Sequence, residues 1–184
     1  SGTTPKNEAS SILFSKTASS GGVSKISRTN LRSKGIHLKG SIILQSLSEF
    51  HKVHFIAIGG IGMSAMARIL LNRGLDVRGS DEKASHITEN LVRQGAKIYI
   101  GHRKEQISDA DLIVVSSAIK YENEELEEAK RIGLPIWHRS TLLKVLMVEK
   151  TSISVTGAHG KTTTSSMLTT LLIHAHMEPS AILG

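Results

Sequence analysis

The feature that most limits the possible folds of this chain is a pair of glycine-rich loops, each between an apolar run and an amphipathic stretch. The first loop, Gly59-Gly60-Ile61-Gly62, follows residues 53–58, and the second, at 157–163, follows residues 152–155. A short apolar run that ends in glycine is typical of a buried strand. Apolar residues at helical spacing after the loop indicate a helix. Two such units predict two phosphate-binding loops in an α/β protein.

Strand-like and helix-like segments alternate between the two loops with short connections. We expect strands at 75–78, 97–100, 112–115 and 134–137, and helices at 63–71, 86–94, 124–131 and 140–149. Such alternation predicts a parallel sheet that is covered on both faces. The predicted fold class is therefore α/β, with a Rossmann-like parallel-sheet domain over residues 51–150. The first βα unit of a P-loop ATPase domain follows over residues 151–184.

The first 46 residues differ in composition from the rest of the chain. They hold seven Lys or Arg, one acid and eleven serines, and supply +6 of the net charge of +7. Residues 1–50 are interpreted as a disordered tail or remnant, or as a transit peptide, which is Ser-rich and poor in acids. A nucleic-acid-binding arm is the third interpretation, and the lack of aromatic residues near the charges disfavours it.

Composition also excludes several classes of function. The chain after residue 46 is nearly neutral, so nucleic acid is not an expected partner. The sequence lacks a run of about 20 apolar residues, so no membrane partner is expected. The absence of cysteine excludes disulfide frameworks, thiolate zinc sites and cysteine nucleophiles.

The first glycine loop fits the pattern G-x-G-x-x-G/A over Gly60 to Ala65. We expect Gly60 to permit a tight turn and Gly62 to let the backbone approach a diphosphate at the start of a helix. Asp81 lies 19 residues after Gly62, where a carboxylate suits a ribose. The motif does not distinguish NAD from a nucleotide-sugar, so an NAD-dependent oxidoreductase and a non-catalytic binding module stay open.

The second loop carries Gly160-Lys161-Thr162, in which Lys161 would reach phosphate oxygens and Thr162 would bind Mg²⁺. Its glycine at 157 lies four residues before Lys161, so the loop is shorter than the standard one. Glu178 is the only acid after Lys161, and a phosphoryl-transfer site needs a second carboxylate on a later strand. We therefore interpret the chain as a truncated one that holds only the opening unit of an ATPase domain.

Two further patterns lead to structural predictions. The helix after the second loop should place Met167, Leu168, Leu171 and Leu172 on one buried face. The acidic cluster at 122–128 is interpreted as the solvated start of a helix that Asn123 caps.

Residues 52–184 resemble the Mur ligases. The most specific matching pieces are Gly-Gly-Ile-Gly-Met-Ser at 59–64 and His-Gly-Lys-Thr-Thr-Thr at 159–164, together with segments 79–81, 100–102 and 116–120. The resemblance implies an ATP- and Mg²⁺-dependent ligase of peptidoglycan precursor synthesis. The similarity is greatest to the members that join L-alanine to UDP-N-acetylmuramate through an acyl phosphate. It implies a cytoplasmic protein, or one of the plastid stroma where the N-terminal segment is a transit peptide.

The resemblance also assigns roles to individual residues. It implies that the UDP-sugar contacts Gly60, Ile61, Gly62, Met63, Ser64, Ser80, Asp81, His102, Ser116, Ser117, Ala118 and Arg139. It implies that ATP contacts Gly157, Ala158, His159, Gly160, Lys161, Thr162 and Thr163, with Lys161 and Thr162 catalytic and Thr162 the Mg²⁺ ligand. Ala158 departs from the threonine that is usual there, and segment 139–143 lacks the usual acid. We expect the chain alone to bind the UDP-sugar without catalysing ligation.

Overall fold

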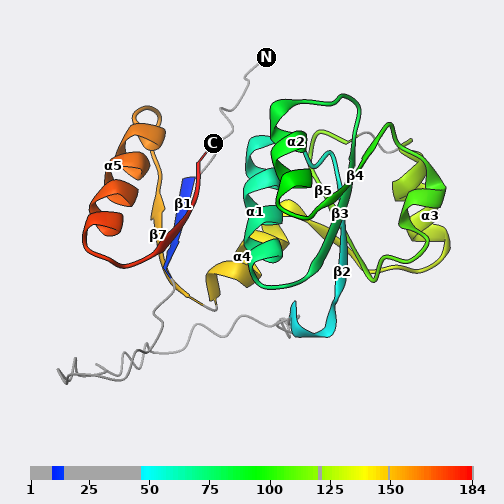
Figure 1. Cartoon of the computed structure of the whole chain (residues 1–184), viewed down its shortest axis with the longest axis horizontal. Helices are drawn as coiled ribbons and strands as arrows, with labels where there is room; N and C mark the ends of the chain where they lie inside the picture. The colour runs from blue at the N-terminus through cyan, green and yellow to red at the C-terminus, as the bar shows by residue number, and fades with distance from the viewer. Residues whose placement is uncertain (1–9, 15–46, 120–121, 149, 184) are drawn as a thin grey trace, which may run out of the picture.

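The computed structural model describes residues 10–14, 47–119, 122–148 and 150–183. Its larger part is a five-stranded parallel sheet in the order β4-β3-β2-β5-β6 (Figure 1). The strands are β2 (Lys52–Ile56), β3 (Asp76–Asp81), β4 (Lys97–Ile100), β5 (Leu112–Val115) and β6 (Ile136–His138). Numbered along the chain from β2, this order is 3-2-1-4-5, which is the Rossmann arrangement. The prediction of a Rossmann-like α/β domain is confirmed.

Helices cover both faces of this sheet (Figure 1). The first face carries α1 (Ile61–Asn72), α2 (His86–Arg93) and α4 (Arg139–Val148), and the second carries the short 3-10 helix η2 (Lys104–Ile107) and α3 (Glu124–Arg131). A further 3-10 helix, η1 (Leu47–Glu49), precedes β2. Side chains alternate along each strand, so Val53 and Phe55 join the core under α1 while Ile56 joins the core under α3.

The strand before the first glycine loop is shorter than the sequence predicts. It ends at Ile56 because Ala57 has a left-handed backbone, with φ of 65°, and the chain then turns toward α1. Gly60 was expected to permit a tight turn, and its amide closes that turn by donating to the Ala57 carbonyl at 3.5 Å. Gly60 has φ of −64° and is the N-cap residue of α1. A residue with a side chain tolerates that conformation. Glycine is therefore needed at position 60 only if a ligand comes close to the loop.

Gly79 in β3 packs tightly against the chain that leads into this turn. A Cβ atom on Gly79 would lie 2.7 Å from the side chain of Ile58 and 2.7 Å from the Phe55 carbonyl oxygen. We expect Gly79→Ala to lower the free energy of unfolding by about 3 kcal/mol, because the added methyl group overpacks the core. Urea titration measures the loss. Gly60→Ala is the control, since its nearest contact would be 3.7 Å, and equal losses in the two variants contradict this prediction.

The second glycine loop belongs to a smaller unit. The predicted strand and helix are present as β7 (Thr151–Val155) and α5 (Lys161–His174). Two strands were not predicted: β8 (Pro179–Ile182) and β1 (Ser10–Phe14), which lies antiparallel between β7 and β8. β1 and η1 both come from the segment interpreted as a tail, and Leu47 of η1 is buried in the core. The rest of that interpretation, over 1–9 and 15–46, lies outside the described residues.

The small unit packs against the Rossmann-like domain through β8, where Ile182 joins the core under α1. The predicted buried face of α5 is only half covered. Leu168 and Leu172 are partly buried, whereas Met167 and Leu171 are 64% and 65% exposed. Over the described residues, the helices lack the length and apolar character that a membrane span requires.

Candidate functional site

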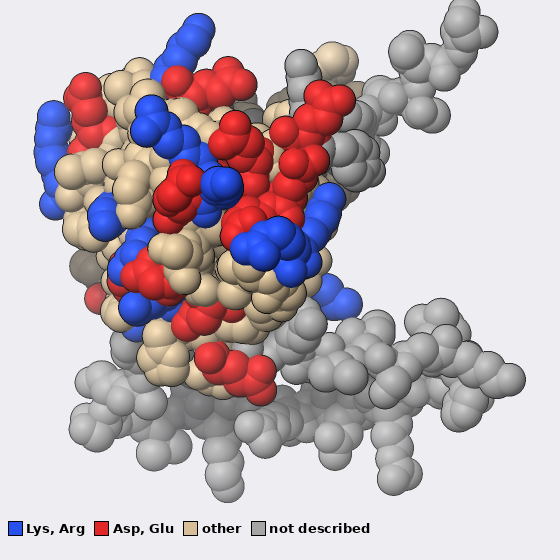
Figure 2. Space-filling view, turned by 90° about the vertical axis from the view of Figure 1, so that its right-hand side faces the viewer, with Lys and Arg blue, Asp and Glu red and all other residues tan. Residues whose placement is uncertain are grey.

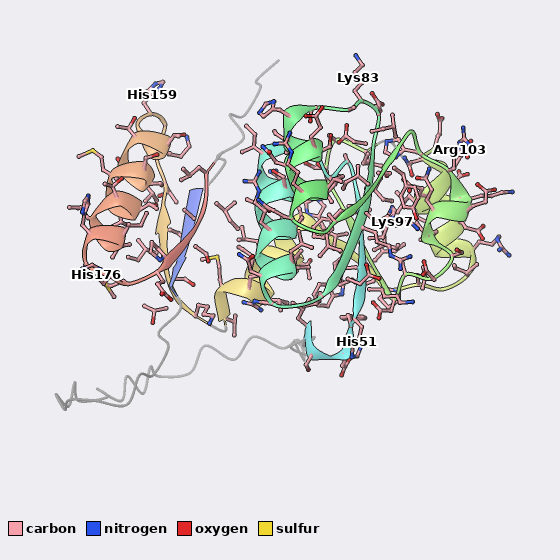
Figure 3. All side chains as sticks on the ribbon, viewed as in Figure 1. His51, Lys83, Lys97, Arg103, His159 and His176 are labelled. Carbon is pink, nitrogen blue, oxygen red and sulfur yellow. The ribbon has the colours of Figure 1, made fainter. Side chains whose placement is uncertain are left out.

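The structure brings the residues predicted to bind the UDP-sugar to one edge of the five-stranded sheet. The first glycine loop follows β2, Asp81 ends β3 and His102 follows β4. Ser116 to Ala118 follow β5, and Arg139 follows β6 at the start of α4. All are at the carboxyl ends of parallel strands, where open α/β sheets bind their ligands. Figure 3 shows this edge at the top right, where Lys83 follows β3.

The first glycine loop ends in an open helix N-terminus. Gly60 caps α1 without a side-chain hydrogen bond, so the amide groups of Ile61, Gly62 and Met63 have no capping acceptor. These N–H groups and the positive end of the helix dipole form an anion site. The Met63 side chain is buried in the core, so only its backbone can face a ligand. The Ser64 hydroxyl donates back to the Ile61 carbonyl at 3.0 Å.

Asp81 holds the glycine loop in place. Its Oδ2 atom accepts a hydrogen bond of 2.8 Å from the Gly59 amide. A Cβ atom on Gly59 would lie only 2.8 Å from the same oxygen, so this contact depends on glycine. The Oδ1 atom accepts only a long bond, of 3.4 Å, from the Lys83 amide. Asp81 therefore keeps one oxygen on the loop, and its contact with a ribose stays a prediction.

Arg139 reaches the first glycine loop from the start of α4, which lies on the same face of the sheet as α1. A Cβ atom on Gly62 would lie 3.6 Å from Arg139 Nη1, which places the guanidinium beside the start of α1. A cation and free amide groups at one point suit a diphosphate. After β5, Ser117 and Ala118 are exposed, and the Ser116 hydroxyl accepts a 3.3 Å bond from the Ala118 amide.

The second glycine loop has the features of a phosphate loop. Gly160 caps α5 with φ of 76° and, having no side chain, supplies no capping hydrogen bond to the first turn of the helix. Lys161 Nζ donates to the Gly157 carbonyl at 2.8 Å and to the Ala158 carbonyl at 3.3 Å. Figure 3 shows His159 at the tip of the loop, pointing away from the protein.

The second loop fits a phosphate-bound Mg²⁺ in part. Thr162 and Thr163 are exposed on the first turn of α5, and the role of Thr162 as a Mg²⁺ ligand stays a prediction. Over the described residues, no group of three His, Asp or Glu could hold a metal ion. These residues therefore offer hydroxyl groups but no cluster of carboxylates to an ion that phosphate oxygens and water would otherwise hold.

The interpretation of the acidic cluster at 122–128 as a solvated helix start is wrong for one of its members. Glu124 and Glu127 are exposed, and the surface around α3 mixes acidic and basic side chains (Figure 2). Glu125 is instead fully buried between α3 and the sheet, with 0% of its side chain exposed. Glu125 lies on the inner face of α3 with Leu126 and Ala129, which are also buried.

Glu125 accepts hydrogen bonds from three other elements, and together these residues form a buried network. Its Oε1 atom is 2.8 Å from Nε2 of His54 in β2. Its Oε2 atom accepts from the Ser80 hydroxyl in β3 and is 2.8 Å from His102 Nδ1. The Gln106 amide, oriented with its NH₂ group inward, donates to Oε1 at 3.0 Å. The structure thus buries Ser80, which was predicted to contact the UDP-sugar, and directs its hydroxyl inward.

The network around Glu125 predicts that the free energy of unfolding decreases at acidic pH. Burial alone would raise the pKa of Glu125, but the hydrogen bonds from His54, Ser80 and His102 outweigh burial and lower it. A carboxyl with a lowered folded pKa stabilises the fold above its unfolded pKa of about 4.3 and loses this effect as pH falls through the folded pKa.

We therefore expect the stability advantage of the wild type over Glu125→Gln to be constant above about pH 5 and to shrink below about pH 4.3. Urea titrations of both proteins between pH 7 and pH 3 measure this difference. A difference that grows toward low pH contradicts the prediction.

The sequence of this chain is similar to those of known proteins. The sequence profile described as "Mur ligase family, catalytic domain" matches residues 52–151. The chain is 51% identical over 133 residues to a protein from Aquifex aeolicus named UDP-N-acetylmuramate--L-alanine ligase, covering 72% of this chain and 29% of that protein. A protein of the same name from Pelobacter propionicus is 47% identical over 136 residues, covering 74% of this chain and 30% of that protein.

Solved structures give the same result. The structure of UDP-N-acetylmuramate-alanine ligase from Thermotoga maritima matches with a TM-score of 0.63 and 31% identity, covering 68% of this chain and 30% of that chain. A murein peptide ligase from Psychrobacter arcticus matches with a TM-score of 0.62 and 26% identity, covering 68% of this chain and 27% of that chain. The chain thus spans about three tenths of the length of its relatives.

Proposed function

Because this chain belongs to the Mur ligase family, we propose that it is the nucleotide-sugar-binding part of a ligase that joins L-alanine to UDP-N-acetylmuramate. The observation that carries the proposal is the meeting of an uncapped helix N-terminus with the guanidinium of Arg139 at the carboxyl edge of the sheet. The amide groups of Gly62 and Met63 would offset the charge of the UDP diphosphate. The names of the relatives supply the identity of the sugar and of the amino acid.

The second loop would hold ATP in the same ligase. Lys161 and the amide groups at the start of α5 would offset the charge on the phosphates, and Thr162 would hold Mg²⁺ beside them. The proposed reaction transfers the γ-phosphoryl group of ATP to the muramic carboxylate, which yields an acyl phosphate and ADP. The amine of L-alanine then displaces phosphate, and an amide forms.

We expect residues 1–184 alone to bind the UDP-sugar without forming the amide. The described residues hold no group of three His, Asp or Glu side chains that could bind a metal ion, and phosphoryl transfer needs carboxylate ligands beside the hydroxyl of Thr162. The proposed location is the cytoplasm, or the plastid stroma where residues 1–46 act as a transit peptide.

Thermal unfolding with separate ligands tests this proposal. UDP-N-acetylmuramate at about 100 times its Kd should stabilise the chain by about 2.7 kcal/mol. For a protein of this size, the Tm should rise by roughly 5–10 °C. NADH at the same concentration is the control, and we expect no shift with it. A shift with NADH and none with the UDP-sugar would overturn the proposal in favour of a dinucleotide-binding module.

A further inference from the structure

The buried network around Glu125 reaches the carboxyl edge of the sheet through one residue, His102. The Glu125 carboxylate and the Ser80 hydroxyl are fully buried, and the His102 side chain is 16% exposed. His102 follows β4, and the amide of the preceding Gly101 donates to the Asp81 carbonyl at 2.8 Å. The imidazole ring therefore lies beside the residue that holds the first glycine loop.

The distances around His102 place a proton on its Nδ1 atom. Nδ1 lies 2.8 Å from Glu125 Oε2 and 2.8 Å from Ser80 Oγ. Without a proton, Nδ1 would direct its lone pair at a carboxylate oxygen, and two acceptors repel each other at this distance. With the proton on Nδ1, the ring donates into the network and Ser80 donates to the same carboxylate oxygen.

The other buried histidine, His54, donates a single hydrogen bond to the network. His54 Nε2 lies 2.8 Å from Glu125 Oε1 and must donate for the same reason. His54 Nδ1 is buried and has no partner among the residues that the structure describes. A second proton on His54 would have no acceptor, so the neutral ring with a proton on Nε2 satisfies this site best. Glu125 is thus a carboxylate that holds the donors of two imidazole rings.

The proton on Nδ1 determines what His102 offers to a ligand. In the neutral imidazole ring, a proton on Nδ1 leaves Nε2 as a hydrogen-bond acceptor. His102 Nε2 has no protein partner in the described part of the chain. Ionised phosphate oxygens only accept hydrogen bonds, so they do not pair with an acceptor nitrogen. A hydroxyl group donates, and it is therefore the group that this nitrogen selects.

We propose that Glu125 is a positioning residue that holds His102 with its proton on Nδ1, so that Nε2 accepts a hydrogen bond from a hydroxyl of the nucleotide-sugar. The proposal rests on the proposed function, because it concerns the same ligand site. It divides the recognition of the ligand between two groups of residues. The amide groups of α1 and Arg139 take the diphosphate, and His102 takes a ribose or sugar hydroxyl.

Nitrogen-15 NMR of the histidine rings tests the positioning role directly, because protonated and unprotonated ring nitrogens have well-separated shifts. The signals of His102 are assigned by their loss in His102→Ala. At pH 8 we expect a protonated Nδ1 and an unprotonated Nε2 in the wild type. In Glu125→Gln, the amide can present its NH₂ group to the ring, so the proton should move at least in part to Nε2. A wild-type His102 with its proton on Nε2 overturns the proposal.

A double-mutant cycle tests whether the effect reaches the ligand through His102. Calorimetry should show that Glu125→Gln weakens binding of UDP-N-acetylmuramate by about tenfold, which is the value of one hydrogen bond. In the His102→Ala background, the same substitution should change affinity by less than about twofold. Glu127→Gln on the exposed side of α3 is the matched control and should change nothing. An equal loss in both backgrounds overturns the proposal, because a merely structural role of Glu125 would act without His102.

The two readouts separate this proposal from the proposed function. If the wild type does not bind the UDP-sugar, the proposed function fails and the ligand part of this proposal fails with it. The NMR spectrum of the wild type still decides the position of the proton on His102, because it requires no ligand.

Discussion

Replacing Glu125 with alanine is expected to lower the free energy of unfolding by about 4 kcal/mol. The substitution removes the acceptor for four donors, namely His54 Nε2, the Ser80 hydroxyl, His102 Nδ1 and the Gln106 amide. His54 and Ser80 are fully buried, so bulk water does not reach the donors that the carboxylate leaves behind. Each unsatisfied buried donor costs about 1–3 kcal/mol.

Urea titration at pH 7 measures this loss, with Glu127→Ala as the control on the same helix. Glu127 is exposed, so its replacement should change stability by less than about 0.5 kcal/mol. A loss below about 1 kcal/mol in Glu125→Ala would mean that the network is not a major stabilising element between α3 and the sheet.

The second large effect is expected on ligand binding, from Gly62→Leu. A Cβ atom at position 62 meets nothing nearer than Arg139 Nη1 at 3.6 Å, so the fold has room for a Cβ atom, and the Tm reports how it accepts the rest of the side chain. In a helix, replacement of glycine also tends to stabilise, by about 0.5–1 kcal/mol. The leucine side chain would, however, occupy the space beside the first amide groups of α1. We expect the affinity for UDP-N-acetylmuramate to fall at least 100-fold, equivalent to about 2.7 kcal/mol.

Isothermal titration calorimetry measures this loss, and the Tm of the variant shows whether it is folded. Asn72→Leu adds the same side chain at an exposed position at the other end of α1 and should leave the affinity unchanged. Unchanged affinity in Gly62→Leu would show that the ligand does not approach the start of α1.

The alternation of strands and helices could be predicted from the sequence because each element carries its own signal. Apolar runs ending in glycine marked the parallel strands, and the helical spacing of Met63, Met66 and Leu70 marked α1, where all three side chains are buried. Parallel strands connected by helices have few possible topologies, so the position of the site at the carboxyl edge followed from the loops. The left-handed backbone of Ala57 could not be predicted, because nothing in its residue type favours it.

The buried network was missed because its residues are far apart in the sequence. An acid in the first turn of a helix is usually solvated, and Glu125 fits that pattern when α3 is considered alone. Two signals could have identified it. His54 interrupts an otherwise apolar strand, and Glu125 shares a helix face with Leu126 and Ala129. The small sheet was missed for a related reason, since β1 and β8 are strands only through their pairing with distant segments.

The bonds of Lys161 in the second loop bear on which ligands this loop can hold. Its ammonium group donates to the carbonyls of Gly157 and Ala158, so the loop itself stabilises this cation. A ligand has to compensate for the loss of these two bonds, and an anionic oxygen does so while a neutral group does not. We therefore expect the loop to select its ligands by charge as well as by the fit of a base or sugar. A nucleoside without phosphates should bind this loop weakly, however well its base would fit.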